Sequence, residues 1–417
     1  MPSKSRPHSA KKHPAPSHAQ HLSAKSKTQP KPAAPPARVQ PGQVRSRPFK
    51  GSQSHPGVHP LSPLASVQSF QPLPKPLGSP PYHYDLESII PGITAQAAKQ
   101  GYLVFHCAGD TGGVKTPDFQ MDVAKAMAAD LASTNGHAPS FFYHLGDVVY
   151  YNGQIADYYS QFYEPYDSYT APIISIPGNH DGDPIDNTQV SLDGWVRYFM
   201  QATAHVNPES QDAPRATMSQ PYVYFTLNCP FVTIVGMYTN VPEGGSIDSV
   251  QQQWLTNEFA TAPEDKALIV ALHHPIYSFD AHHSGSARMA DVVQHAINDS
   301  RRVPNAVFTA HVHDYQRFER TLVEQSPTPF FVIGHGGYYN LHGLTAAPGT
   351  TDPNTQAKLV AGNDTQHGYA TFTVDAKTIT GTMSLVEDLK RPANSKADTF
   401  SYPAGAILLP DPATVSL

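Results

Sequence analysis

Short apolar runs alternate with helical patterns in the first part of the chain that looks folded. Residues 102–108 and 140–145 are each long enough for a buried strand, and residues 121–131 between them place apolar side chains at helical spacing. A third run at residues 173–176 follows a tyrosine-rich stretch, residues 158–166, that we expect to be helical. This order predicts a repeated β-loop-α unit, which is typical of an α/β fold.

The later part of the chain is richer in strand patterns. After a polar insertion at residues 182–220, residues 222–227 and 231–237 flank a turn and are expected to pair as antiparallel strands. Further strands are expected at residues 267–272, 306–310, 330–333, 369–374 and 378–385, and helices at residues 195–200, 249–259 and 287–297. Helices that alternate with strands early and strand pairs that dominate later fit a β-sandwich with helices on its outer faces.

Charge and proline divide the chain of 417 residues into two parts. Residues 1–84 hold 12 Lys and Arg, no Asp or Glu, and 18 of the 41 prolines. Because they lack the apolar periodicity of a packed core, we predict a disordered, basic, proline-rich tail. Residues 85–417 carry 16 basic and 34 acidic side chains, a formal charge of −18, and form the predicted folded domain. We expect the tail to be a solvated linker, with nucleic-acid or other anionic contact as the weaker alternative.

Membrane and export signals are not evident in the sequence. No window approaches the roughly 18 apolar residues of a membrane span, and no apolar stretch follows the basic N-terminus as in a secretory signal. We therefore expect a cytoplasmic protein without a membrane span. The two cysteines, Cys107 and Cys229, lie in apolar runs and are expected to be buried free thiols.

Side chains that commonly bind metals follow five of the predicted strands. In chain order they are Asp110; Asp147 and Tyr150; Asn179 and His180; His273; and His311 and His313. Because open α/β sheets place ligands at the carboxyl ends of their strands, we expect these side chains to converge. Carboxylate, imidazole and amide groups suit iron, zinc or manganese. A carboxylate shared by two ions about 3.5 Å apart is suited to displacement at phosphorus.

These side chains occur in five motifs. They are Gly109-Asp110-x-Gly112, Gly146-Asp147-x-x-Tyr150, Gly178-Asn179-His180-Asp181, Val270-x-x-His273-x-Pro275 and His311-x-His313. In this order the motifs resemble those of the calcineurin-like metallophosphoesterases. Gly112 after Asp110 and Tyr150 after Asp147 narrow the resemblance to the purple acid phosphatases. It implies a four-layer αββα sandwich with the metal site at strand carboxyl ends, and a catalytic domain within residues 85–417.

The resemblance also implies a ligand set for two metal ions. Fe3+ would take Asp110, Asp147, Tyr150 and His313, and a second ion, Fe2+, Zn2+ or Mn2+, would take Asp147, Asn179, His273 and His311. The substrate-facing histidines of the family would correspond to His180, His282 and His283. The implied activity is acid phosphatase activity, in which a metal-bound hydroxide hydrolyses small phosphate monoesters. A phosphodiesterase on the same centre and a non-enzymatic metal-binding module are the alternatives.

Several neighbours of these residues have an expected role or an alternative one. The glycines at the strand exits, such as Gly178, are expected to allow positive φ and a sharp turn. We expect Asp181 to support a histidine. Ala310 stands where the family usually has glycine, which is tolerable if its φ is negative. The adjacent His282 and His283 would otherwise be an ordinary solvated pair in a polar loop.

Overall fold

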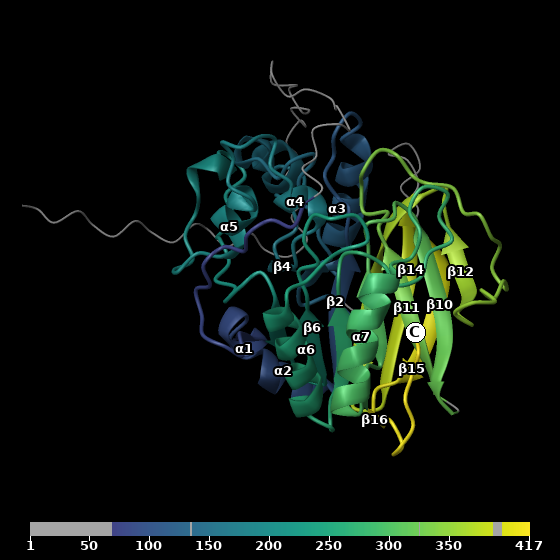
Figure 1. Ribbon diagram of the computed structural model, residues 1–417. Coiled ribbons are helices and arrows are strands. Elements are labelled where there is room, and N and C mark those ends of the chain that lie inside the picture. The colour runs from purple at the N-terminus through teal and green to yellow at the C-terminus, as the bar shows by residue number, and fades with distance from the viewer. Residues whose placement is uncertain (1–68, 134–135, 325, 387–393) are drawn as a thin grey trace, which may run out of the picture. The chain divides into compact units, whose positions relative to one another are not determined.

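The structure is a computed structural model that describes residues 69–133, 136–324, 326–386 and 394–417. Its helices are α1 (Leu86–Ile89), α2 (Ile93–Gln100), α3 (Asp118–Asp130), α4 (Asn179–Gly182), α5 (Asp193–Phe199), α6 (Ser249–Thr261) and α7 (Ala287–Ser300), with shorter helical turns η1 (Ile155–Asp157), η2 (Tyr159–Tyr163) and η3 (Pro208–Ser210). Figure 1 shows how these helices surround the strands.

The strands form two large sheets. One has eight strands in the order β1 (His83–Asp85), β5 (Phe225–Asn228), β6 (Val232–Gly236), β7 (Ala267–Ala271), β9 (Ala306–Thr309), β11 (Ser326–Ile333), β10 (Tyr315–Val323) and β12 (Lys358–Asn363). The other has six, in the order β15 (Asn394–Pro403), β14 (Thr378–Val386), β13 (His367–Asp375), β2 (Tyr102–Ala108), β3 (Phe142–His144) and β4 (Ile173–Ser175). A small third sheet pairs β16 (Ile407–Leu408) with β8 (Arg302–Val303).

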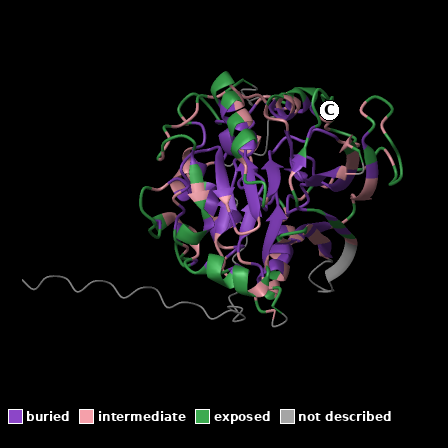
Figure 2. Ribbon diagram, turned by 90° about the horizontal axis from the view of Figure 1, so that it is seen from below, coloured by how far each residue is buried: buried purple, intermediate pink, exposed green. Residues whose placement is uncertain are grey.

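Aromatic side chains fill the space between the two large sheets. Phe372 of β13 lies with its ring centre 4.4 Å from that of Phe308 on β9 and 5.4 Å from that of Phe331 on β11. Phe105 of β2 stacks on Phe372 at 5.4 Å, and all four rings are buried. Figure 2 shows the strands buried in the middle of the molecule and exposed residues concentrated on the surrounding helices and loops. The two sheets therefore share one core.

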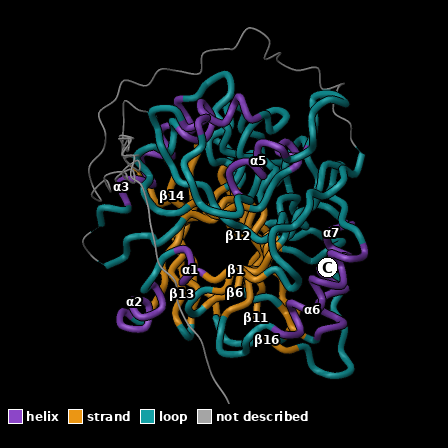
Figure 3. The backbone as a smooth tube through the Cα atoms, turned by 90° about the vertical axis from the view of Figure 1, so that its left-hand side faces the viewer, coloured by secondary structure: helices purple, strands orange, loops and turns teal. Residues whose placement is uncertain are grey.

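Helices cover the outer faces of this sandwich. In Figure 3, α6 and α7 lie on one side of the strands, and α2 and α3 lie on the other. Helix α3 packs against β13 and β14, whereas α6 and α7 pack against each other and against β8. The order of layers is helix, sheet, sheet, helix, so the predicted αββα sandwich is confirmed.

Most predicted elements are present near their expected bounds. The tyrosine-rich stretch differs, because it forms the turns η1 and η2 and not one regular α-helix. Strands β10, β12 and β15 were not predicted. Their sequences mix polar and apolar residues, and they become strands through pairing, as where β10 bonds to β11 on one side and β12 on the other.

The predicted boundary at residue 85 falls inside a strand. Residues 69–84, which we assigned to the tail, belong to the described fold. His83 of β1 pairs with Thr226 of β5, and the backbone nitrogen of Leu77 donates to the carbonyl oxygen of Pro221 at 2.9 Å. The rest of the predicted tail, residues 1–68, lies outside the described residues and its disorder stays a prediction.

Two other expectations can be compared with the fold. Cys107 and Cys229 are both buried free thiols, as expected. No helix in the described part of the chain combines the length and the apolar character that crossing a bilayer requires.

Candidate metal centre

The carboxyl ends of neighbouring strands deliver all seven predicted ligands to one place. In the six-stranded sheet, β2, β3 and β4 run parallel and are followed by Asp110, Asp147 with Tyr150, and Asn179. In the eight-stranded sheet, β7 and β9 run parallel and are followed by His273 and by His311 with His313. Parallel pairing puts these loops at one edge of each sheet, and packing of the sheets brings the two edges together.

Tyr150, Asp110 and His313 form the first cluster of ligand atoms. The Tyr150 hydroxyl donates to Asp110 Oδ1 at 2.9 Å and lies 3.3 Å from His313 Nε2. His313 Nε2 is 3.7 Å from Asp110 Oδ1, so the three atoms form a compact triangle. All three side chains are buried.

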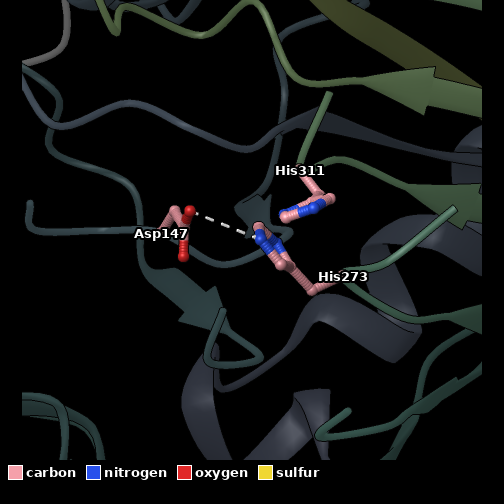
Figure 4. A group of neighbouring side chains, drawn as sticks. All are labelled: Asp147, His273 and His311. Atoms are coloured by element: carbon pink, nitrogen blue, oxygen red, sulfur yellow. Dashed lines mark ion pairs between the residues drawn. The ribbon is translucent and has the colours of Figure 1, made fainter. Parts of the chain in front are cut away.

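The second cluster is built around the amide oxygen of Asn179. His273 Nε2 lies 3.0 Å from Asn179 Oδ1, and His311 Nδ1 lies 2.9 Å from the same oxygen. His273 Nε2 is also 3.4 Å from Asp147 Oδ2. Figure 4 shows Asp147, His273 and His311 turned toward one another, with the Asp147–His273 contact dashed. Atoms of these three residues lie within 4.8 Å of one another, so they could hold a metal ion.

The spacing of these atoms fits metal coordination. Two ligand atoms that each lie about 2.1 Å from one ion, at tetrahedral or octahedral angles, are about 3.0–3.4 Å apart. The closest pairs in the two clusters span 2.9–3.7 Å. Asp147 Oδ2 is buried and has no hydrogen-bond partner. Because a buried carboxylate oxygen without a hydrogen bond is costly, this atom is suited to binding a cation.

The electrostatics also call for positive charge. Burial raises the pKa of Asp110 well above its usual range, and the neighbouring Asp147 adds to that rise. Burial, followed by Asp110 and Asp147, raises the pKa of the Tyr150 hydroxyl, so the protein alone keeps it protonated. Burial by itself would lower the pKa of His273, but Asp147 and Asp110 raise it to about 9. The two carboxylates thus attract positive charge, and a bound cation could stabilise a Tyr150 phenolate there.

Each ligand-type histidine is oriented through its second ring nitrogen. His273 Nδ1 lies 2.8 Å from the Leu145 carbonyl oxygen, and His313 Nδ1 lies 3.1 Å from that of Asn340. A carbonyl accepts, so these contacts leave the Nε2 lone pairs facing the centre. His311 is turned the other way, with Nδ1 toward Asn179 and Nε2 3.5 Å from a Glu243 carboxylate oxygen. Such outer partners are what fix the tautomer of a metal-binding histidine.

Backbone strain marks three of the strand exits. Asp110, Asp147 and His311 have φ of 54°, 55° and 68°, a region that non-glycine residues rarely adopt. Strain of this kind concentrates at functional sites. Ala310 is not among the residues with positive φ, so its methyl group is tolerated in this respect.

The expected reason for Gly178 was wrong. Its φ is −95° and its ψ is −172°, which any residue adopts. Glycine is required there by close approach, since a Cβ atom would lie 2.1 Å from Asp147 Oδ1. Gly146 does have positive φ, at 96°.

Asp181 also has a different role from the one expected. Its carboxylate accepts hydrogen bonds from the backbone nitrogens of Val148, Val149 and Gly178 at 2.8–3.3 Å. It supports no histidine in these contacts. It ties the loop after β3 to the loop after β4, which fixes Asp147 relative to Asn179.

The predicted substrate-facing histidines lie at different depths. The backbone nitrogen of His180 donates to Asp147 Oδ1 at 2.9 Å, and its ring is 4.6 Å from that of Tyr150, beside the first cluster. The His283 ring is 4.6 Å from that of His311, beside the second. His282 is exposed, and its ring contacts His342 at 4.6 Å.

Three residues around the centre were missed from the sequence. Glu243 contacts His311 and also lies 3.1 Å from His283 Nδ1, and these three residues form a second group that could hold a metal ion. His342 is buried with its ring 4.5 Å from that of His313, and Asp280 lies 3.2 Å from His342 Nδ1. None of the three stands in a motif. Only their proximity to the ligand-type histidines identifies them.

Curated relatives of this chain are purple acid phosphatases. Probable purple acid phosphatase 20 of Arabidopsis thaliana is 26% identical over 282 residues, which cover 61% of this chain and 60% of that protein. Purple acid phosphatase 22 of the same plant is 26% identical over 249 residues, covering 55% of this chain and 53% of that protein. The chain thus spans little more than half the length of these relatives.

Solved structures share the fold at lower identity. The purple acid phosphatase PPD1 from yellow lupin (Lupinus luteus) seeds matches with a TM-score of 0.52 and 17% identity, covering 72% of this chain and 53% of that one. GAP50, the anchor in the inner membrane complex of Plasmodium, matches with a TM-score of 0.51 and 13% identity, covering 74% of this chain and 90% of that one. These likenesses concern the fold alone.

The family assignment rests on a match to a family model. The model of the calcineurin-like phosphoesterases matches residues 103–315, about half of the chain. That range contains all five strand ends and the seven ligand-type side chains that they bring together. The chain belongs to the calcineurin-like phosphoesterase family.

Proposed function

We propose that this protein is an acid phosphatase that hydrolyses phosphate monoesters with two metal ions. One observation carries the proposal. Seven oxygen and nitrogen side chains from five strand ends meet in two adjacent clusters, and a buried Asp147 oxygen there has no hydrogen-bond partner. The family and its purple acid phosphatase relatives support phosphoester hydrolysis.

The two clusters suggest which residues would hold each ion. Asp110, Tyr150 and His313 would hold the first, which we propose to be Fe3+ because a phenolate ligand favours a highly charged cation. Asn179, His273 and His311 would hold the second, Fe2+, Zn2+ or Mn2+. Asp147 would serve both, since its Oδ2 lies 3.4 Å from His273 Nε2 of the second cluster and its Oδ1 accepts from the backbone nitrogen of His180, whose ring lies beside Tyr150 of the first.

When bound, the ions would polarise the phosphoryl group and an attacking water. The chain's own residues would orient the ester. His180 has its Nδ1 engaged by the Tyr151 carbonyl oxygen at 2.8 Å, so its Nε2, carrying a proton, would be the nitrogen that donates to a phosphoryl oxygen. His283 occupies the same position relative to the second cluster. These imidazoles would hold the terminal oxygens while the leaving group departs.

Metal analysis combined with a visible spectrum tests the centre. We expect two metal ions per chain, one of them iron, and an absorption band from tyrosinate bound to iron that disappears in Tyr150→Phe. The matched control is Tyr151→Phe, which changes the adjacent tyrosine and should keep the band. A colourless, iron-free protein that is still active would overturn the Fe3+ assignment and leave a phosphoesterase with other metals.

Paired substrates decide between the ester classes. Turnover of an aryl phosphate monoester should exceed that of the matching diester, and the reverse would favour a phosphodiesterase. The non-enzymatic alternative has a structural neighbour in GAP50, described as an anchor. It predicts purified protein that turns over neither ester.

A further inference from the structure

A second layer of imidazoles covers the ligand-type histidines. The ring of His283 lies 4.6 Å from that of His311, and the ring of His342 lies 4.5 Å from that of His313. The two outer rings stack on each other at 5.5 Å, with 29° between their planes. His342 therefore occupies the same position over the first cluster that His283 occupies over the second.

Backbone pairing between two distant loops creates this layer. Ala281 N donates to the Gly343 carbonyl oxygen at 3.0 Å, and Thr345 N donates to that of Phe279 at 2.7 Å. Asp280 forms an antiparallel bridge with Leu344 between them. A short two-stranded ladder thus fixes residues 282–283 beside residue 342, although the two loops are about 60 residues apart in sequence.

The carboxylate of Asp280 organises the imidazoles at the end of this ladder. Its Oδ2 accepts hydrogen bonds from the backbone nitrogens of His282 and His283 at 2.9 and 2.7 Å, and lies 3.2 Å from His342 Nδ1. The Asp280 side chain is fully buried, and its Oδ1 has no hydrogen-bond partner. A buried carboxylate with an unpaired oxygen lowers stability, so its presence here needs a functional explanation.

Both outer rings are held through Nδ1. His342 Nδ1 faces Asp280, and His283 Nδ1 lies 3.1 Å from a Glu243 carboxylate oxygen. A carboxylate partner of this kind orients an imidazole and leaves its Nε2 for another ligand. The two Nε2 atoms thus belong to rings packed directly against the two clusters.

We propose that His342 contacts the phosphoryl oxygens of the substrate beside His283, and that Asp280 is the positioning residue that holds both. The proposal rests on the proposed function and extends it, because it names the groups that engage the ester beyond the metal centre. Two neighbouring imidazoles suit a phosphoryl group with three terminal oxygens, as in a monoester or inorganic phosphate. A diester has only two terminal oxygens and cannot satisfy the metals and both rings equally well.

Binding of inorganic phosphate to the metal-loaded full chain tests this inference without turnover. In His342→Ala, calorimetry should show phosphate affinity at least about tenfold weaker, which is the usual effect of losing one hydrogen bond to a charged group. KM for an aryl phosphate should rise by a similar factor, with a smaller change in kcat and the same metal content. The matched control is His295→Ala on α7, an exposed histidine paired with Asp299, which should change none of these quantities.

Asp280 is tested by two substitutions. Asp280→Ala should weaken phosphate binding as much as His342→Ala or more. The phosphate affinity of Asp280→Asn should lie between those of Asp280→Ala and the wild type, since the amide oxygen can still accept from the backbone nitrogens of residues 282 and 283. A purely structural role would instead lower the melting temperature and leave the phosphate affinity of the folded protein unchanged.

The outcomes separate this inference from the proposed function. If the wild type hydrolyses the ester, and His342→Ala has the same phosphate affinity and KM as the wild type, the inference is wrong and the proposed function stands. Phosphate binding that depends on His342, in a protein that hydrolyses no ester, would sustain the inference and overturn the function. A metal-loaded wild type that binds no phosphate would overturn the inference as well.

Discussion

Replacing Gly178 by alanine tests how tightly the metal centre is fixed by packing. The backbone of Gly178 is extended, so alanine introduces no strain in φ or ψ. Its Cβ would, however, lie 2.1 Å from Asp147 Oδ1 and 2.4 Å from the Asp147 backbone nitrogen. Ordinary contacts of a Cβ atom begin at 3.4 Å, so one of the two strand ends has to move by about 1 Å.

Neither strand end can move freely. Asp147 Oδ1 accepts from His180 N at 2.9 Å, and Asp181 bonds to the backbone on both sides of the contact. Overpacking of this kind costs about 1–3 kcal/mol of unfolding free energy. For a folded part of about 350 residues, at roughly 2.1 cal/mol/K of unfolding entropy per residue, that lowers the melting temperature by about 1–4 °C. Displacing Asp147 and Asn179 should also weaken metal affinity by about 10–100-fold.

The assay combines thermal unfolding with titration of Zn2+ into chelator-treated protein. The control is Gly405→Ala, because no heavy atom lies within 4 Å of a Cβ built there. We expect Gly178→Ala to have a lower melting temperature than the control both with and without chelator, since the clash does not depend on the metal. If Gly178→Ala matches Gly405→Ala in melting temperature and Zn2+ affinity, the reasoning from close approach is wrong.

Three further predictions concern charge. Glu243→Gln removes the carboxylate beside His311, so affinity for the second ion should fall about tenfold by Zn2+ titration. Exposed Glu264→Gln is the control, and equal affinity in both variants would contradict the role of Glu243. With chelator present, the unfolding free energy of Asp147→Asn should be about 3 kcal/mol lower than that of the wild type, because His273 Nε2 loses the carboxylate that pairs with it at 3.4 Å; an equal or higher unfolding free energy in urea would refute this. Burial lowers the pKa of His335 to about 3, below the roughly 6.5 of an unfolded chain, so the wild type loses stability as pH falls below about 6.5. His335→Leu has no imidazole to protonate at this position, so its unfolding free energy should rise by about 2 kcal/mol relative to that of the wild type as the pH falls from 7 to 5. An equal pH dependence of the two unfolding free energies would refute this prediction.

The local sequence determined the types of side chain at the strand ends. Asp110, Tyr150 and His313 were predicted to converge because each follows an apolar run, and the carboxyl ends of parallel strands meet at one edge. Their assignment as metal ligands stays a prediction. The β-sandwich with helices on its outer faces followed from the same runs, since buried strands are apolar enough to be seen by their pattern alone.

Polar strands and supporting contacts depended on tertiary structure. Strands β10, β12 and β15 form because neighbouring strands offer ladder hydrogen bonds, which no local pattern encodes. The need for glycine at position 178 depends on an atom of Asp147, 31 residues earlier. The Asp181 carboxylate bonds to backbone nitrogens whose direction is set only in the folded loops.

The outer layer of the site also combines a residue predicted from the sequence with residues that only the tertiary structure identifies. His283 was predicted from the family resemblance, whereas His342, Asp280 and Glu243 carry no local signal. His342 and Asp280 meet because residues 279–281 pair with residues 343–345, and that pairing places polar side chains from separate loops over one centre. By itself the sequence determined which chemical groups the strands deliver. Only tertiary packing decided which groups support them, because contacts between distant segments depend on how the two sheets and their loops pack together.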